Sequence, residues 1–214
     1  MKDLGTYRKS YEKSELIESE IPSHPIELFN KWFAEVEAFC GIEEINAMSV
    51  ATIGLDGFPK ARVVLLKQLT SEGFVFYTNY NSEKGKALLA NPQAGISFFW
   101  PNLERQVIIK GFAAKIDAQT STSYFNSRPV GSQLGAIVSP QSEVISNRAF
   151  LESKLHDLEN EFKNKTIPRP ENWGGFLIKP ISVEFWQGRA NRLHDRIRYQ
   201  LKDDKSWTID RLAP

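Results

Sequence analysis

Residues 47–78, AMSVATIGLDGFPKARVVLLKQLTSEGFVFYT, decide the class of fold. They hold β-branched and aromatic runs at 47–53, 60–68 and 74–78, separated by GLDG (54–57) and TSEG (70–73). Such runs are typical of β-strands, and glycine-containing polar segments between them favour tight turns. The stretch therefore predicts an antiparallel meander.

The remainder of the chain adds strands and amphipathic helices to this meander. Further strands are expected at 94–100, 106–116, 175–180, 182–188, 196–201 and 207–212. Helices are expected from a Ser23 N-cap to Phe39, from Ser82 to Asn91, at 120–127, and from Ser142 to about Asn164. We predict an α+β fold in which a β-barrel of antiparallel strands carries peripheral helices.

Length and composition predict one domain and limit its partners. The 214 residues are 41% hydrophobic, enough for one core, so residues 1–22 are expected to form a mobile polar arm and residues 23–214 the domain. The near balance of 27 Lys and Arg with 26 Asp and Glu gives no general attraction to nucleic acid or a membrane. Cys40 is the only cysteine and no run of 18 apolar residues occurs, so we expect a cytoplasmic protein without an internal disulfide.

Two cations flank the aliphatic strand RVVLLK (62–67). Because side chains alternate along a strand, the odd separation of Arg62 and Lys67 predicts opposite faces and allows two anion sites. The alternative is that both are strand-end charges that reach solvent.

The segment YTNYNSEKGK (77–86) runs from a strand into a predicted helix. Its hydroxyls, the free N–H groups of the helix start and Lys84 are suited to a phosphate, although a solvated helix start explains them equally well. Gln106 carries an amide that can both donate and accept hydrogen bonds to a ligand, with a buried structural glutamine as the alternative. Gln141 and Ser142 are interpreted as a helix cap or as ligand contacts.

Tyr124, Arg128 and Ser132 recur every four residues. On a continuous helix they would share one face and offer a phenol, a guanidinium and a hydroxyl to one phosphate. Pro129 must bend or end that helix, so a solvated helix end is the alternative.

The segment EFWQGRANRLHDR (184–196) concentrates arginine, histidine and tryptophan. Such residues are costly to bury without partners, which favours a functional site. His24 and His156 fit structural positions, so His194 is the candidate catalytic histidine.

These segments resemble the pyridoxamine 5'-phosphate oxidase family. The resemblance rests on RVVLLK (62–67), FYTNYNSEKG (76–85), LERQV (103–107), YFNSRPVGSQLGA (124–136), QSEVISNR (141–148), WGGF (173–176), EFWQGRANRLHDR (184–196) and RLAP (211–214). It implies a split β-barrel homodimer that holds FMN at the subunit interface, with each site drawing residues from both chains. It also implies oxidation of pyridoxamine and pyridoxine 5'-phosphates to pyridoxal 5'-phosphate by O2, with release of H2O2, and of ammonia from the amine.

The resemblance also assigns roles to residues of this chain. The implied FMN contacts are Arg62, Val63, Val64, Leu65, Leu66, Lys67, Tyr77, Thr78, Lys84, Gln106, Gln141, Ser142, Trp186 and Arg196. The implied substrate contacts are Lys67, Tyr124, Arg128 and Ser132 at the phosphate, Arg192 and His194 at the reacting end, and Arg8 and Tyr11 from the arm. Arg192 and His194 are the implied catalytic residues, and the resemblance leaves open which of them is a base.

Glu83 departs from the family pattern. Family members often have Ser-Arg-Lys where this chain has Ser82-Glu83-Lys84, so an anion replaces a cation beside the expected FMN phosphate. In solvent the repulsion would be about 1 kcal/mol or less, so weaker or rearranged phosphate contacts are expected rather than lost activity.

Three other functions compete with this hypothesis. Another split-barrel flavoprotein, such as an FMN or deazaflavin reductase, would not need Tyr124, Arg128, Ser132, Arg192 and His194 together. A non-catalytic flavin or B6-phosphate carrier would bind without turnover. A nucleic-acid-binding barrel is disfavoured by the near-neutral charge. The preference between the two substrates and the presence of a second pyridoxal phosphate site stay open.

Overall fold

The computed structural model describes residues 2–7, 9–39, 41 and 43–214. The chain forms two compact units, each assembled from separate stretches of sequence. The first unit contains Met1–Val50, Gly95–Gly111 and Pro180–Pro214, and the second contains Ala51–Ala94 and Phe112–Lys179.

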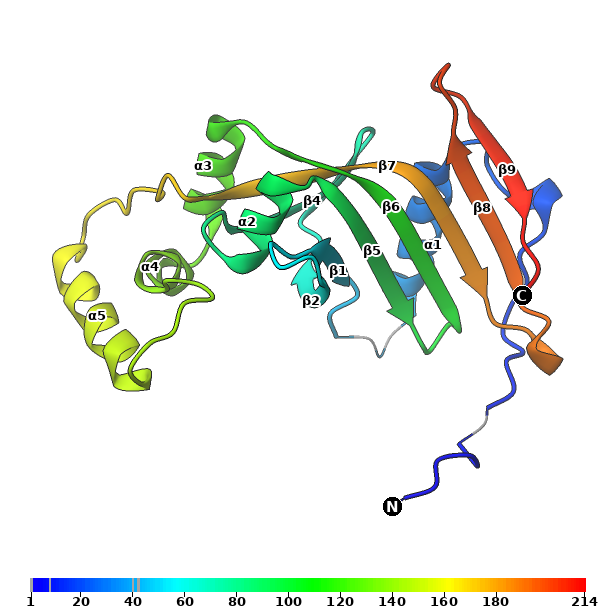
Figure 1. Cartoon of the computed structure of the whole chain (residues 1–214), viewed down its shortest axis with the longest axis horizontal. Coiled ribbons are helices and arrows are strands. Elements are labelled where there is room, and N and C mark those ends of the chain that lie inside the picture. The colour runs from blue at the N-terminus through cyan, green and yellow to red at the C-terminus, as the bar shows by residue number, and fades with distance from the viewer. Residues whose placement is uncertain (1, 8, 40, 42) are drawn as a thin grey trace. The chain divides into compact units, whose positions relative to one another are not determined.

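Groups of consecutive strands are separated by helices in an α+β arrangement (Figure 1). The strands are β1 (Ala47–Ile53), β2 (Pro59–Leu65), β3 (Gln68–Thr70), β4 (Gly73–Asn79), β5 (Gln93–Trp100), β6 (Arg105–Lys115), β7 (Trp173–Gln187), β8 (Asp195–Leu201) and β9 (Trp207–Arg211). The α-helices are α1 (Pro25–Ala38), α2 (Glu83–Ala90), α3 (Ala118–Ser127), α4 (Val130–Val138) and α5 (Arg148–Glu161), and short 3-10 turns occur at η1 (Glu18–Glu20) and η2 (Ala190–Arg192). The strands hydrogen-bond in the order β2-β1-β5-β6-β7-β4-β3, and β8 pairs with both β7 and β9.

In the first unit, α1 buries one aromatic face against strands. Phe29 packs edge-on against Phe98 with ring centroids 5.0 Å apart, and Trp32 packs against Phe185 at 5.1 Å. Phe29 and Trp32 are three residues apart, close to one helical turn, so they lie on the same apolar face of α1. The predicted helix is confirmed, but its N-cap is His24 rather than Ser23, because the His24 side chain accepts the Ile26 N–H.

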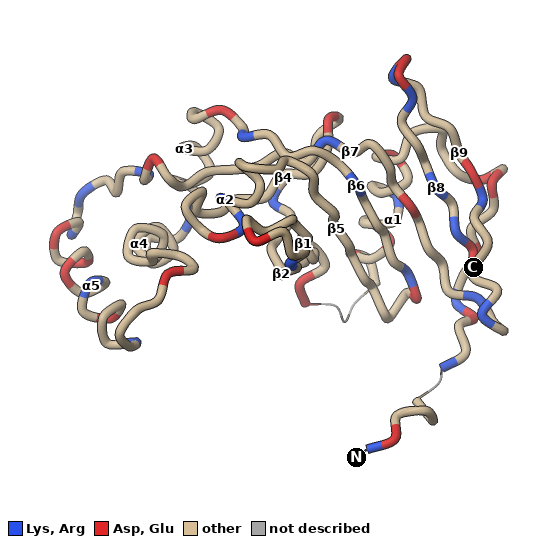
Figure 2. Tube along the Cα trace, viewed as in Figure 1, with Lys and Arg blue, Asp and Glu red and all other residues tan. Residues whose placement is uncertain are grey.

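In the second unit, α3, α4 and α5 surround an apolar cluster beside β4 and β7. Its buried members are Phe125, Leu134, Ile167 and Trp173. α5 adds Leu155 and Leu158 to this cluster, and its C-cap residue Phe162 joins them, while charges of both signs follow the rest of the helix (Figure 2). β4 pairs antiparallel with β7, and this pairing sets Tyr77 opposite Gly175.

The predicted meander is confirmed in part: β1 neighbours β2 and β3 pairs with β4, but the middle run is not one strand. The run 60–68 divides into β2, which ends at Leu65, and β3, which begins at Gln68. β4 pairs with β3 and β7 and is not a neighbour of β2 in the sheet. Local sequence marks strands and turns, but the partner of a strand depends on contacts distant in sequence.

Two other boundaries differ from the prediction. The segment 175–188 was expected as two strands, and it forms the single strand β7 that continues through Pro180. The helix expected from Ser142 begins six residues later at Arg148, where the Asn147 side chain accepts the Phe150 N–H as N-cap. Ser142 has a φ of 75°, a left-handed conformation that is incompatible with a helix start.

Across the described part of the chain, no helix combines the length and the apolar character needed to span a bilayer.

Candidate active site

A cavity of about 710 Å³ opens in the second unit. This volume falls in the ordinary range for a small-molecule site, about 300–1,000 Å³. Its lining comes from β2, β4, α2, the α3–α4 region and the start of β7. The lining residues are Arg62, Val63, Val64, Leu65, Lys67, Tyr77, Thr78, Asn79, Lys84, Tyr124, Arg128, Pro129, Ser132, Gly135, Ala136, Ser139, Gln141 and Trp173.

Arg62 and Lys84 bring two positive charges to the wall of this cavity. Arg62 donates to the hydroxyl of the buried Thr52 at 2.9 Å, and the Lys84 ammonium lies 3.4 Å from both the Thr78 hydroxyl and the Gln141 amide oxygen. Burial lowers the pKa of Lys84, and the neighbouring charge of Arg62 lowers it further. Two cations that repel each other in a partly buried wall are stabilised by an anion, so this part of the cavity is suited to a phosphate.

Glu83 lies beside these cations but forms an ion pair outside the cavity lining. Its carboxylate is 2.6 Å from the Lys60 ammonium, and both side chains are exposed. Its negative charge works to raise the pKa values of Arg62 and Lys84, against the stronger effect of burial. Glu83 therefore acts on the site through its charge.

Tyr124, Arg128 and Ser132 all line the cavity, although no single helix carries them. α3 ends at Ser127, Arg128 is extended at its C-cap with a ψ of 152°, and α4 begins after Pro129. The proline thus ends the helix, as its missing N–H and fixed ring require, and the chain still directs the three side chains to one cavity. Burial lowers the pKa of Arg128, and its buried Nη1 has no hydrogen-bond partner among the described residues.

Arg62 and Lys67 line the same cavity, contrary to the prediction of opposite faces. The prediction assumed that one strand runs through both residues. β2 ends at Leu65, so side-chain alternation does not extend to Lys67. Leu66 is buried and is not part of the lining.

Three aromatic rings stack along this cavity. Tyr77 and Tyr124 have ring centroids 3.8 Å apart, and Trp173 lies 5.5 Å from Tyr77 and 6.2 Å from Tyr124, all nearly parallel. No role was predicted for Trp173, although the WGGF segment at 173–176 is part of the family resemblance.

A second group of predicted residues gathers in the first unit. Trp186 on β7 lies 4.6 Å from the His194 ring, measured between ring centroids, and Tyr11 approaches both rings edge-on at 5.7 and 5.8 Å. Arg192 is exposed on the turn η2, where Asn191 and Arg192 both have a positive φ. Consecutive non-glycine residues in this region are strained, which is a feature of functional turns.

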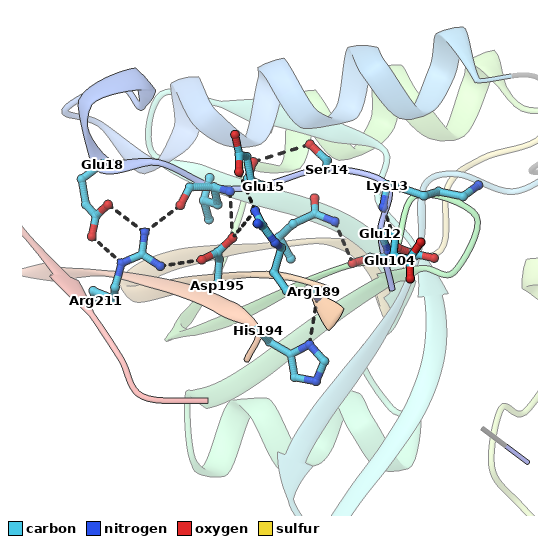
Figure 3. Close-up of polar contacts among 12 residues, drawn as sticks. Glu12, Lys13, Ser14, Glu15, Glu18, Glu104, Arg189, His194, Asp195 and Arg211 are labelled. Atoms are coloured by element: carbon cyan, nitrogen blue, oxygen red, sulfur yellow. Dashed lines mark hydrogen bonds and ion pairs between the residues drawn. The ribbon is translucent and has the colours of Figure 1, made fainter. Parts of the chain in front are cut away.

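The geometry fixes the hydrogen-bonding state of His194. The Arg189 backbone N–H donates to His194 Nδ1 at 3.1 Å, so Nδ1 accepts and the neutral ring carries its proton on Nε2 (Figure 3). Burial lowers the pKa of His194, Arg192 lowers it further, and Asp195 opposes them in part. A neutral ring with a donating Nε2–H is therefore favoured near neutral pH.

A polar network ties residues 12–18 to this part of the first unit (Figure 3). Arg211 pairs with Glu18 and Asp195, and Arg189 pairs with Glu15 and Asp195. Asp195 also accepts the Leu16 N–H at 3.1 Å. The segment next to Tyr11 thus follows a defined path past His194.

The remaining predicted residues lie elsewhere. In the first unit, Gln106 donates to Ser97 at 3.1 Å, and Arg196 is held by Glu184 and the Ala213 carbonyl, both at 2.8 Å. In the second unit, Ser142 lines a smaller depression of about 300 Å³ beside Glu83. Arg8 lies outside the described residues. Within the described chain, no cluster of His, Cys, Asp and Glu is suited to a metal ion.

The sheet, its helices and the cavity define a β-barrel protein suited to a phosphorylated ligand. The family model described as pyridoxamine 5'-phosphate oxidase matches residues 34–161, and that of the pyridoxine 5'-phosphate oxidase C-terminal dimerisation region matches residues 173–214. Proteins named pyridoxine/pyridoxamine 5'-phosphate oxidase are similar over the full length of both chains: that of Flavobacterium johnsoniae is 67% identical over 213 residues and that of Salinibacter ruber 49% over 216. The chain belongs to the pyridoxamine 5'-phosphate oxidase family.

Solved structures confirm the fold. PhzG from Burkholderia lata, solved with tetrahydrophenazine-1-carboxylic acid, is 28% identical with a TM-score of 0.86, over 92% of this chain and 95% of that one. A pyridoxamine 5'-phosphate oxidase-related, FMN-binding protein from Nostoc punctiforme has a TM-score of 0.70 at 16% identity, over 91% of this chain and all of the other. The predicted split β-barrel of antiparallel strands with peripheral helices is confirmed.

Proposed function

We propose that this chain is an FMN-dependent oxidase that converts pyridoxamine and pyridoxine 5'-phosphates to pyridoxal 5'-phosphate. O2 is the electron acceptor, H2O2 is released, and the amine also yields ammonia. The observation that carries the proposal is the cavity, which holds two groups of cations and hydroxyls in a chain of this family. Arg62 and Lys84 suit one phosphate, and Tyr124, Arg128 and Ser132 suit another.

The cavity residues fit FMN. Arg62 and Lys84 supply charge for its phosphate, while Thr78 and Gln141 supply a hydroxyl and an amide next to Lys84. The backbone and aliphatic side chains of Val63 to Leu65 give a wall for the flat ring system. FMN, when bound, supplies the redox chemistry that amino-acid side chains lack, accepting a hydride equivalent and passing electrons to O2.

The protein contributes position and charge. Arg128, Tyr124 and Ser132 hold the substrate phosphate, and this binding energy orients the reacting carbon. His194 donates its Nε2–H to the oxygen on the substrate ring. Arg192 places a positive charge at the reacting end, where charge changes during oxidation.

The active protein is a homodimer in which each site combines residues of both chains. The match of residues 173–214 to a dimerisation region supports this arrangement. Arg192, His194 and Trp186 of one chain then complete the cavity that the second unit of its partner forms. Dimerisation is accordingly required for catalysis.

A visible absorption spectrum of the purified protein tests the proposal. We expect the flavin absorption bands to bleach when pyridoxamine 5'-phosphate is added in the absence of oxygen. When air is admitted, the bands should return and H2O2 should be released. Bands that stay unchanged despite substrate binding would identify a carrier. Bleaching by a nicotinamide or deazaflavin donor alone would identify a reductase.

A further inference from the structure

The Arg128 guanidinium is held in the cavity by an aromatic ring. Its central carbon lies 4.7 Å from the centroid of the Trp173 ring and 5.8 Å from that of Phe125. A cation within about 6 Å of a ring face is attracted by the quadrupole of the ring. Phe125 is fully buried and Trp173 nearly so, which strengthens this attraction.

Among the described residues, no carboxylate forms an ion pair with Arg128, and Nη1 is buried without a hydrogen-bond partner. The lack of a paired carboxylate matters for ligand binding, because a carboxylate would neutralise the guanidinium and compete with an incoming phosphate. An aromatic face fixes the cation and leaves its N–H donors available.

Trp173 is itself firmly placed. Its backbone N–H donates to the Pro170 carbonyl at 3.0 Å, and its carbonyl accepts from Arg169. Its ring is nearly parallel to those of Tyr77 and Tyr124, with interplanar angles of 12° and 7°. The indole thus contacts both Tyr124 and Arg128 and fixes their separation.

We infer that Trp173 is a positioning residue for recognition of the substrate phosphate, and that it acts by holding the Arg128 guanidinium in the cavity without neutralising its charge. The inference rests on the proposed function, since it assigns the substrate phosphate to Arg128. It predicts that Trp173 governs the discrimination between phosphorylated and unphosphorylated B6 vitamers.

The test compares ligand affinities of the FMN-loaded wild-type, W173L and W173F proteins. In W173L the Kd for pyridoxal 5'-phosphate should rise roughly 3- to 30-fold, the range expected from loss of a buried cation–π contact. The Kd for unphosphorylated pyridoxal should be unchanged. W173F keeps an aromatic face and should lose less than W173L.

A double-mutant cycle separates positioning from general damage. In an R128Q background, W173L should cause little further loss of pyridoxal 5'-phosphate affinity, since the cation that Trp173 holds is gone. Equal weakening of phosphorylated and unphosphorylated ligands, or additive losses of W173L and R128Q, would overturn the inference. If W173L does not fold, the ratio of the two Kd values in W173F decides.

These affinities are measured without turnover, so they do not depend on the oxidase reaction. Absence of oxidation by the wild-type protein would refute the proposed function. The affinity ratio would still decide whether Trp173 positions Arg128 for a phosphate.

Discussion

Glu83 shows how one residue adjusts the charge of the candidate site. It occupies the first turn of α2, where the helix N-terminus and Lys84 favour an anion, and it forms an ion pair with Lys60. E83R removes a negative charge near Arg62 and Lys84 and adds a positive one. We expect the Kd for FMN to fall by about 2- to 5-fold at low salt, as an exposed charge effect of about 1 kcal/mol or less allows.

The matched control for E83R is E83Q, which removes the charge and nearly conserves shape. Its Kd for FMN should lie between those of wild type and E83R, and both differences should shrink as salt is added. Fluorescence titration of the apoprotein with FMN measures each value. An unchanged Kd in both variants would show that the Lys60 ion pair already cancels the charge of Glu83.

Protonation of His194 should cause the acid limb of the pH–rate profile. Burial lowers its pKa below the ordinary value of 6.5, and Arg192 lowers it further, so the ring is neutral in the folded protein at neutral pH. As pH falls through this lowered pKa, the ring gains a proton, Nδ1 can no longer accept from Arg189, and kcat/KM should fall. The midpoint should lie below pH 6.5.

A pH series of kcat/KM for wild type and H194Q tests this assignment. H194Q keeps a hydrogen-bonding side chain that does not titrate, so its residual activity should lack the same acid limb. The lowered pKa of His194 also makes the free energy of unfolding increase with pH. Between the lowered and the ordinary pKa values the unfolded chain binds more protons than the folded one, so the folded state gains stability as pH rises. An acid limb that persists in H194Q would assign it to another group.

At the scale of elements, Glu104 anchors the segment that carries Tyr11. Its buried carboxylate accepts the N–H groups of Glu12 and Lys13 at 2.8 and 3.1 Å and pairs with Lys9 at 3.1 Å. Burial works to raise the pKa of Glu104, but these donors outweigh it and the net pKa is lowered. The carboxylate therefore stays ionised and holds the segment.

E104A should release this segment while the rest of the fold persists. Trypsin cleavage at Lys9 and Lys13 should become at least several-fold faster, because removal of the acceptor frees hydrogen bonds each worth about 1.5–3 kcal/mol when charge-assisted. The control E104Q keeps one acceptor oxygen and should be cleaved at an intermediate rate. Equal cleavage of wild type and E104A would show that the Asp195 and Arg211 contacts hold the segment alone.

The sequence predictions were correct where an element depends on residues close together in the chain, and they failed where it depends on strand pairing. α2 was placed correctly because Ser82 caps it by accepting the Gly85 N–H, a signal within four residues. The break between β2 and β3 at Leu66 and Lys67 was missed, because the aliphatic pattern continues while the pairing changes. The position of Lys67 in the cavity depends on that break and could not be derived from side-chain alternation.

The candidate site likewise combines features that local sequence predicts with features that depend on long-range packing. The four-residue spacing of Tyr124, Arg128 and Ser132 correctly suggested one shared location, although the helix that justified it ends before Pro129. The role inferred for Trp173 could not emerge from spacing, because its contact with Arg128 spans 45 positions and depends on how α3 packs against β7. Long-range packing of this kind becomes visible only in three dimensions.

At the scale of the whole molecule, the candidate residues divide between the two compact units. The cavity with Arg62, Lys84 and Arg128 belongs to the second unit, and Trp186, Arg192 and His194 belong to the first. In the proposed homodimer, a complete site takes its first-unit residues from the partner. Symmetry then gives two equivalent sites, each dependent on both chains.

Heterodimers of two inactive variants test this arrangement. One chain carries R128A in its second unit and the other carries R192A in its first, with different affinity tags for tandem purification. If each site combines units of different chains, one site receives both substitutions and the other receives neither. The heterodimer should therefore regain about half of the wild-type kcat/KM, whereas each homodimer stays far below it. A heterodimer no more active than the two homodimers would show that each site is built within a single chain, because every site would then retain one substitution.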